Sequence, residues 1–156
     1  MKHRVRAAGL LIKDQHILLV LHRLPETGAE WWIPPGGGLE EMDQTIFDAA
    51  RREIFEETGL HVNPSRIAYI REFREISNRT YHLEFFLPID SYSGQITMEN
   101  IPVNDIDYGI IKSVQWLHQS ELQDLVVWPD WIKEDWFWED ARNGFPVTRY
   151  TGVSAE

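Results

Sequence analysis

The sequence predicts an α/β fold of the α+β type, in which a mixed sheet lies between helices. Short runs rich in Val, Leu and Ile alternate with turn residues, one central segment has helical periodicity, and further helical segments follow the last strand-like run. With 156 residues and a mass of 18.3 kDa, the chain suits one domain over residues 1–156 with a single core.

The N-terminal part of the chain contains three strand-like runs. Residues 4–12 and 16–22 are rich in Val, Leu and Ile and are joined by the polar residues 13–15, which predicts a hairpin. A short strand is expected at residues 31–33. It is followed by the sequence PPGGG at residues 34–38, which predicts a loop.

The central helix is expected at residues 44–58, because Gly59 can take the left-handed conformation that ends helices. The later predicted strands are residues 66–76, 80–89 and 113–117, with a turn at 77–79, and the later predicted helices are residues 120–125 and 131–143. The aromatic run 136–138 in the last helix indicates either core packing or a homodimer interface, since large aromatic side chains are common in both.

The charge of the chain opposes several classes of partner. A formal net charge of -10 and a pI near 5.0 disfavour general binding to nucleic acids and to anionic membranes. The N-terminal segment lacks the unbroken apolar stretch of a signal peptide or membrane helix, so we expect a cytoplasmic protein. There is no cysteine, and the scattered histidines form no zinc-binding spacing. A site for phosphate would therefore need a bound cation.

Three glutamates of the central helix fall on one face. Glu53, Glu56 and Glu57 are three and four residues apart, and the apolar residues Ile46 and Ala49 lie in or beside the same arc of the helical wheel. Like charges at these spacings repel, and the helix dipole disfavours acids in the last turn. A hard cation would reverse both penalties. The alternative is a solvated acidic helix end, the commoner meaning of such a charge pattern.

A longer pattern surrounds these glutamates and resembles a known family. Gly38 is followed after five residues by Gln44, and after seven more by the sequence REIFEETGL at residues 52–60. This spacing resembles the Nudix box of the MutT-like pyrophosphohydrolases, G-x5-E-x7-R-E-U-x-E-E-x-G-U, where U is apolar. The box would occupy residues 38–60, and the preceding WIPPGG at residues 32–37 is similar to the W-x-P-G-G entry of the family. So many fixed positions make this far more specific than a lone glycine-rich loop.

The box departs from the family pattern at one position. Gln44 stands where the family has its first glutamate, and the loop before it is one residue longer than usual. Asp43 or Glu41 could supply the missing carboxylate. The resemblance implies that this first glutamate is secondary to the later three.

The resemblance implies a role for each matched residue. Glu53, Glu56 and Glu57 would bind Mg²⁺, or alternatively Mn²⁺, and Arg52, Glu53 and Glu57 would be the catalytic residues, with Arg52 orienting a glutamate. The substrate and phosphate loop would be Gly36, Gly37 and Gly38. The alternatives are a surface salt bridge for Arg52 and a simple turn for the glycines.

The general base is less defined by the sequence. The resemblance makes Glu53 the first candidate, although members of the family also use glutamates from other loops. The acids that spacing alone does not rank are Glu84, Glu99, Asp105 and Asp107. Arg23 could contact phosphate or lie on the surface. The aromatic residues that could stack on a nucleobase, or pack in the core instead, are Trp31, Trp32, Tyr69, Trp128 and Trp131.

Taken together, the sequence predicts an enzyme of the Nudix pyrophosphohydrolase type. It would hydrolyse a pyrophosphate bond in a nucleoside diphosphate linked to another moiety, or in a nucleoside triphosphate. Its partner would be a small nucleotide-type substrate. The alternative functions are a catalytically silent domain of the same fold that senses a nucleotide or nucleotide-sugar, and an acidic protein-interaction domain. No feature after the box distinguishes one diphosphate substrate from another.

Overall fold

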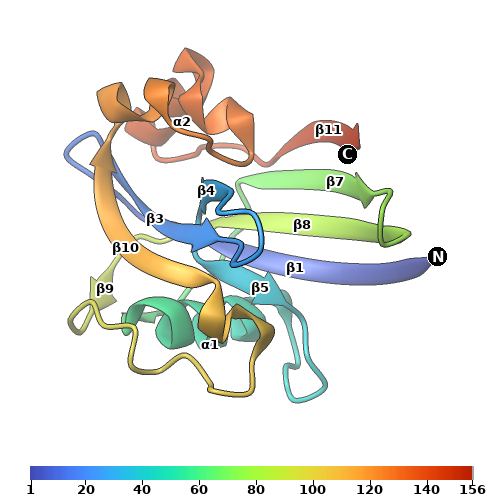
Figure 1. Cartoon of the computed structure of the whole chain (residues 1–156). Coiled ribbons are helices and arrows are strands. Elements are labelled where there is room, and N and C mark those ends of the chain that lie inside the picture. Colours follow the sequence, from blue (N-terminus) through green and yellow to red (C-terminus); the bar gives the residue numbers. More distant parts are fainter. Residues whose placement is uncertain (156) are drawn as a thin grey trace.

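The computed structural model describes residues 1–155 and contains a mixed sheet between two helical regions (Figure 1). The strands are β1 (Lys2–Leu10), β2 (Ile12–Lys13), β3 (His16–Arg23), β4 (Glu30–Ile33), β5 (Gly36–Gly38), β6 (His61–Val62), β7 (Tyr69–Glu75), β8 (Thr80–Pro88), β9 (Tyr92–Ser93), β10 (Ile111–His118) and β11 (Arg149–Ala155). The α-helices are α1 (Ile46–Thr58) and α2 (Asp135–Arg142), and the short 3₁₀ helices are η1 (Ile106–Gly109), η2 (Gln119–Asp124) and η3 (Asp130–Lys133).

The largest sheet has five strands in the order β11-β7-β8-β1-β5. The β1–β8 and β11–β7 pairs are parallel and the β7–β8 and β1–β5 pairs are antiparallel, so the predicted mixed sheet is confirmed. A second sheet joins β10, β3 and β2, with β4 paired to β3. Helix α1 lies below the five-stranded sheet in Figure 1 and α2 lies above it, which confirms the layered α+β architecture.

The predicted N-terminal hairpin is wrong for most of its length. Only Ile12 and Lys13 pair with the start of β3, whereas β1 pairs with β8 and β5 in the other sheet. The chain leaves the first sheet after β1 ends at Leu10, and Ile12 begins the short pairing with β3. The turn at Asp14 and Gln15 has φ values of 50° and 60°, as a two-residue turn between antiparallel strands requires.

The expected loop at Gly36–Gly38 is instead strand β5, and this prediction is corrected. Its backbone is extended and pairs with Arg6–Ala8 of β1. A Cβ on Gly36 would lie 2.3 Å from the carbonyl oxygen of Ala7. The glycines therefore serve close approach between backbones rather than a sharp turn.

Helix α1 begins two residues later than the sequence predicts. Thr45 is the N-cap: its hydroxyl oxygen accepts a hydrogen bond from the backbone N–H of Asp48, whose carboxylate accepts one from the N–H of Thr45. Gln44 thus lies outside the helix. The predicted end is confirmed, since Gly59 has φ 78° and its N–H donates to the carbonyl of Phe55.

The second half of the chain largely follows the predicted order. The strand predictions at residues 66–76, 80–89 and 113–117 correspond to β7, β8 and part of β10, and the helix predicted at 120–125 overlaps η2. The segment predicted as one helix at 131–143 divides into η3 and α2. Strands β6, β9 and β11 were not predicted, because they are short or mostly exposed and lack a continuous apolar run.

Two apolar clusters hold the layers together. One lies against α1 and includes Leu11, Ala50 and Ile54, and the other contains the aromatic residues Tyr69 and Phe137 on the α2 side. In the run at 136–138, Phe137 and Trp138 are buried in the core, as one of the two sequence interpretations expects, whereas Trp136 is exposed. Within residues 1–155, no helix is both long and apolar enough to cross a membrane.

The capping geometry generates a stability prediction. Thr45→Ala should lower the free energy of unfolding by about 1 kcal/mol, because it removes the acceptor of the Asp48 N–H. Gln44→Ala is the matched control and should change that free energy by less than about 0.5 kcal/mol, since its exposed side chain makes no cap. Urea denaturation of both variants measures the difference. A larger loss for Gln44→Ala would place the start of the helix at residue 44.

Candidate functional site

The buried face of α1 includes two of the three predicted carboxylates. Glu53 is 6% exposed and Glu57 is 2% exposed, and they continue the buried stripe that includes Ala50 and Ile54. Glu56 is only partly buried, with a side chain 21% exposed. The prediction that the carboxylates continue the apolar stripe is therefore confirmed for Glu53 and Glu57, for which a solvated helix end is wrong.

Strand β5 lies directly against these carboxylates. A Cβ on Gly37 would lie 2.3 Å from the carboxyl carbon of Glu53, so only glycine leaves room for the acid at this position. The backbone N–H of Gly36 donates to Oε2 of Glu57 at 3.2 Å. The three glycines are thus part of the carboxylate site, although they form a strand rather than the predicted loop.

Arg52 joins the helix, the preceding loop and β5. Its guanidinium donates to Oε1 of Glu53 at 2.9 Å and to the carbonyl oxygen of Gly38 at 3.0 Å. It also forms a two-pronged ion pair with Asp43, with nitrogen–oxygen distances of 3.1 and 2.7 Å. Such a forked, largely buried pair fixes orientation far better than a surface salt bridge does.

Asp43, next to Gln44 in the sequence, is a buried acid that pairs with Arg52. The side chain of Asp43 is 3% exposed, and its hydrogen bonds with Arg52 lower its pKa. Asp43 also accepts a hydrogen bond from the backbone N–H of Glu40 at 2.9 Å. Glu41 and Gln44 are exposed. Of the two acids that the sequence left open, the structure brings Asp43 to Arg52.

The electrostatics of the cluster are unfavourable without a cation. Burial, followed by the negative charges of Glu56 and Asp105 and against the effect of Arg52, raises the pKa of Glu53 to about 7. Burial, together with Glu53 and Asp107, raises the pKa of Glu57 well above its usual range. Positive charge at this point would favour the ionised form of both acids.

One carboxylate oxygen is left without a partner. Oε1 of Glu57 is buried and has no hydrogen-bond partner within residues 1–155. In the described part of the chain, no three His, Cys, Asp or Glu side chains already converge as a metal-binding group. An orphaned buried acceptor beside a second buried carboxylate nevertheless fits a hard divalent cation.

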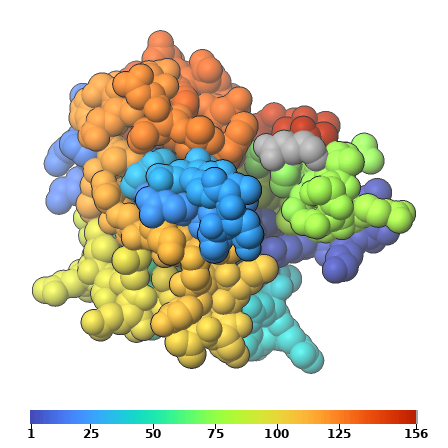
Figure 2. All heavy atoms as spheres, viewed as in Figure 1, coloured from blue at the N-terminus to red at the C-terminus, as the bar shows by residue number. Residues whose placement is uncertain are grey.

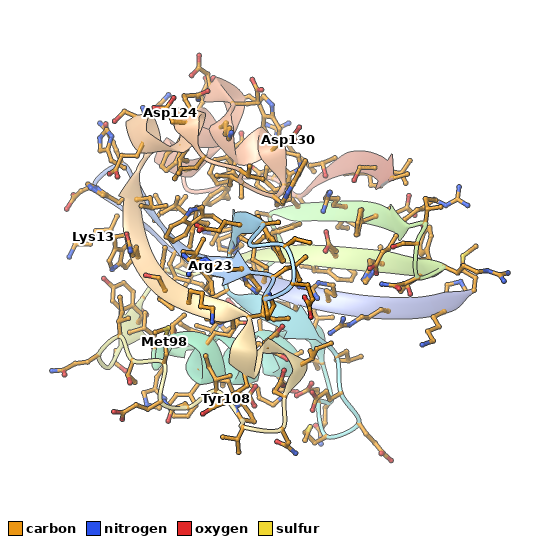
Figure 3. The ribbon with its side chains drawn as sticks, in the orientation of Figure 1. Lys13, Arg23, Met98, Tyr108, Asp124 and Asp130 are labelled. Atoms are coloured by element: carbon orange, nitrogen blue, oxygen red, sulfur yellow. The ribbon has the colours of Figure 1, made fainter. Side chains whose placement is uncertain are left out.

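The four acids that the sequence did not rank lie in different surroundings. Asp105 directly precedes η1 and Asp107 lies within it. The charge of Asp105 helps to raise the pKa of Glu53, and that of Asp107 helps to raise the pKa of Glu57. Figure 3 shows Tyr108, next to Asp107, at the α1 end of the molecule. Glu84 is instead paired with Arg6 and Arg71. Glu99 follows Thr97, whose hydroxyl accepts its N–H.

The arginine beside the site is Arg4, which the sequence analysis missed. A Cβ on Gly38 would lie 2.7 Å from Nε of Arg4. Burial, followed by the positive charge of Arg6, lowers the pKa of Arg4. Only the register of β1 against β5 brings it there. Arg23, the candidate for phosphate contact, instead pairs with Glu30 at 2.9 Å.

Most of the candidate stacking residues are already packed against protein. Tyr69 and Trp32 are buried in the core, and Trp31 stacks on His22 at a centroid distance of 5.4 Å. Trp131 packs on Tyr69 at 4.8 Å, and Trp128 is exposed. Figure 2 shows the segment leading into β4, in blue, across the middle of the visible face.

Known protein structures share this fold. A NUDIX hydrolase from Nitrosomonas europaea superimposes with a TM-score of 0.73 and 24% sequence identity, covering 96% of this chain and 93% of that chain. The solution structure of the E. coli ORF135 protein gives a TM-score of 0.69 and 20% identity, covering 94% of this chain and 96% of that one. At these identities the likeness concerns the fold.

Sequence relatives match the chain over shorter stretches. The m7GpppN-mRNA hydrolase NUDT17 of Danio rerio is 50% identical over 36 residues, which cover 23% of this chain and 12% of that protein. A 17.7 kDa protein of Enterobacteria phage T4 is 31% identical over 96 residues, or 57% of this chain and 64% of that protein. The human 8-oxo-dGDP phosphatase NUDT18 is 32% identical over 65 residues, or 42% and 20%. The chain thus spans less than two thirds of each relative's length.

The family is decided by a match over most of the chain. The NUDIX domain profile covers residues 2–137, which include β5, the Arg52–Asp43 pair and all three glutamates of α1. The chain therefore belongs to the NUDIX domain family.

Proposed function

We propose that this protein is a metal-dependent pyrophosphohydrolase. It would cleave the diphosphate of a nucleoside diphosphate linked to another moiety, or of a nucleoside triphosphate. The observation that carries this proposal is the buried pair Glu53 and Glu57, one oxygen of which has no protein partner within residues 1–155. Local stability does not favour such a pair, whereas a cation-dependent reaction explains it.

The printed names of two relatives support the reaction class. One is an 8-oxo-dGDP phosphatase and another is an m7GpppN-mRNA hydrolase, so both act on phosphorylated nucleotide compounds. Their matches cover only part of their lengths, and the substrate of this chain is proposed only as a class. A small nucleotide-type molecule is the partner that we propose.

Glu53, Glu56 and Glu57 would hold Mg²⁺, or alternatively Mn²⁺, through carboxylate oxygens. When bound, the cation polarises phosphoryl oxygens and stabilises negative charge in the transition state. Arg52 holds Glu53 in place through its own contacts with Asp43 and Gly38. Oε2 of Glu57 accepts from the N–H of Gly36, and Oε1 has no hydrogen-bond partner within residues 1–155.

Glu53 is the proposed general base. This assignment follows the position of Glu53 in the box and its contact with Arg52, because a bound cation would lower the pKa that burial raises. The oxygen of water would attack one phosphorus, its proton would pass to Glu53, and the bond from that phosphorus to the bridging oxygen would break. The bridging oxygen leaves with the second phosphate, so two phosphorylated products form.

The alternative is a domain that binds a nucleotide without hydrolysing it. All three box glutamates are present here, and Arg52 is fixed by Asp43, so the catalytic arrangement is favoured. Incubation with a panel of nucleoside diphosphate derivatives and Mg²⁺, followed by identification of both products by mass, separates an enzyme from a sensor. Binding without products would support the sensor.

Charge removal at the cluster tests the residue roles. Glu53→Gln and Glu57→Gln should each lower kcat by orders of magnitude without unfolding the protein, since several kcal/mol of transition-state stabilisation depend on the metal site. Glu26→Gln is the control, because this exposed acid lies in the loop before β4. Steady-state kinetics with and without chelator measure the effect. Full activity in excess chelator would reject the mechanism.

Metal binding should also appear in stability. Mg²⁺ should raise the melting temperature, because only the folded helix gathers the three glutamates. Glu56→Gln/Glu57→Gln should melt higher than the wild type without metal, since it removes two neighbouring acids of which Glu57 is buried, and should gain less from Mg²⁺. Differential scanning calorimetry compares the two. Equal metal-induced shifts in both proteins would show that the cation binds elsewhere.

Asp43 and Gln44 are neighbours in the box, and their variants should differ in activity. Asp43→Asn should lower kcat by more than tenfold and leave KM little changed, because Arg52 loses its charged anchor and no longer holds Glu53. Gln44→Ala should cost less than about tenfold, and Gln44→Glu should change turnover little, with Glu57→Gln as the severe reference. If Gln44→Ala proved as damaging as Glu57→Gln, the assignment of Asp43 would be wrong.

A further inference from the structure

A cavity of about 540 Å³ lies between α2 and β11, outside the glutamate site. Strand β11 is at the opposite edge of the five-stranded sheet from β5, which is four strand spacings or roughly 19 Å away. Figure 1 shows α2 at the top and β11 at the upper edge of the sheet, with α1 at the bottom. One phosphate group cannot reach both places.

Aromatic side chains form part of the cavity lining. Trp131, Trp136 and Tyr150 line it, and the rings of Trp131 and Trp136 are 5.7 Å apart at an angle of 37°. Trp131 is supported from behind by Tyr69 at 4.8 Å, and the hydroxyl of Tyr150 donates to Glu72 at 2.6 Å. These rings are therefore held in place, and Trp136, which is 40% exposed, offers surface for another planar ring.

The charges of the lining disfavour a phosphate. Arg149, the cation of the cavity, is already paired with Asp140 at 2.9 and 3.1 Å, and the hydroxyl of Tyr69 also donates to Asp140. The remaining charged residue is Glu139, so the lining carries net negative charge. An anionic group would be repelled here, whereas an uncharged or cationic group would not.

Polar groups beside the rings can recognise the edge of a heterocycle. Asn143 contributes a side-chain amide, a group that can donate and accept at once and that pairs with the edges of nucleobases.

We propose that the cavity between α2 and β11 binds a planar nitrogen heterocycle without negative charge, namely the base of a nucleoside. Stacking on Trp136 and Tyr150 would provide most of the affinity, and Asn143 would contact the base edge. The cavity would hold the base of such a molecule and no phosphate group. The proposal does not depend on hydrolysis, because a nucleoside has no pyrophosphate bond.

Nucleoside titration without metal tests this site. In spectra of the ¹⁵N-labelled full chain, adenosine and guanosine should shift the indole N–H signals of Trp131 and Trp136 saturably, and inorganic pyrophosphate should not. Trp136→Ala should weaken binding by about fivefold or more, and Tyr150→Ala provides a second variant on an exposed side chain.

Trp128→Ala is the matched control for the stacking residue. Trp128 is 38% exposed, close to the 40% of Trp136, but it does not line the cavity. Unchanged affinity in Trp128→Ala, with weakened binding in Trp136→Ala and Tyr150→Ala, supports the proposal. Absence of saturable shifts with both nucleosides, shifts of the same signals by pyrophosphate, or equal weakening in Trp128→Ala would overturn it.

Discussion

The burial of two carboxylates on one helix face is the constraint on which the site depends. Glu53 and Glu57 lie in the layer between α1 and the sheet, where ionised acids are costly without a counter-charge. The surroundings compensate only in part. Arg52 neutralises one side of Glu53 and Gly36 donates to Glu57, yet one oxygen of Glu57 keeps no partner within residues 1–155. The remaining imbalance is what a divalent cation would correct.

Several features of the fold follow from making room for these acids. Strand β5 consists of glycines, and a side chain at Gly37 would occupy the position of the Glu53 carboxylate. Because β5 pairs with β1, the register also brings Arg4 against Gly38. The forked pair between Arg52 and Asp43 ties the loop before α1 to the helix. The contacts that position β5 and the loop before α1 are therefore also the contacts that hold the carboxylates of the site.

The parts of this arrangement that could be predicted are those with short-range signals. The spacing of the glutamates and Gly59 gave the helix, its buried face and its end, because a helix relates residues three and four apart. Pairing between distant segments has no such signal. The hairpin was wrong because β1 pairs with β8 and β5, which lie further along the chain. Arg4 was missed because its place depends on the β1–β5 register. The sequence left open which of Asp43 and Glu41 lies at the box, since only the fold shows which acid reaches Arg52.

Anomalous diffraction from crystals of the protein soaked in Mn²⁺ tests the central claim most directly, because it locates the cation without reference to activity. The account predicts a manganese peak about 2.0–2.2 Å from Oε1 of Glu57, as expected for a small hard divalent cation. This oxygen has no protein partner within residues 1–155. A carboxylate oxygen of Glu53 or Glu56 should lie at a similar distance from the same peak. Manganese bound only elsewhere, with Oε1 of Glu57 still unpartnered, would contradict the account.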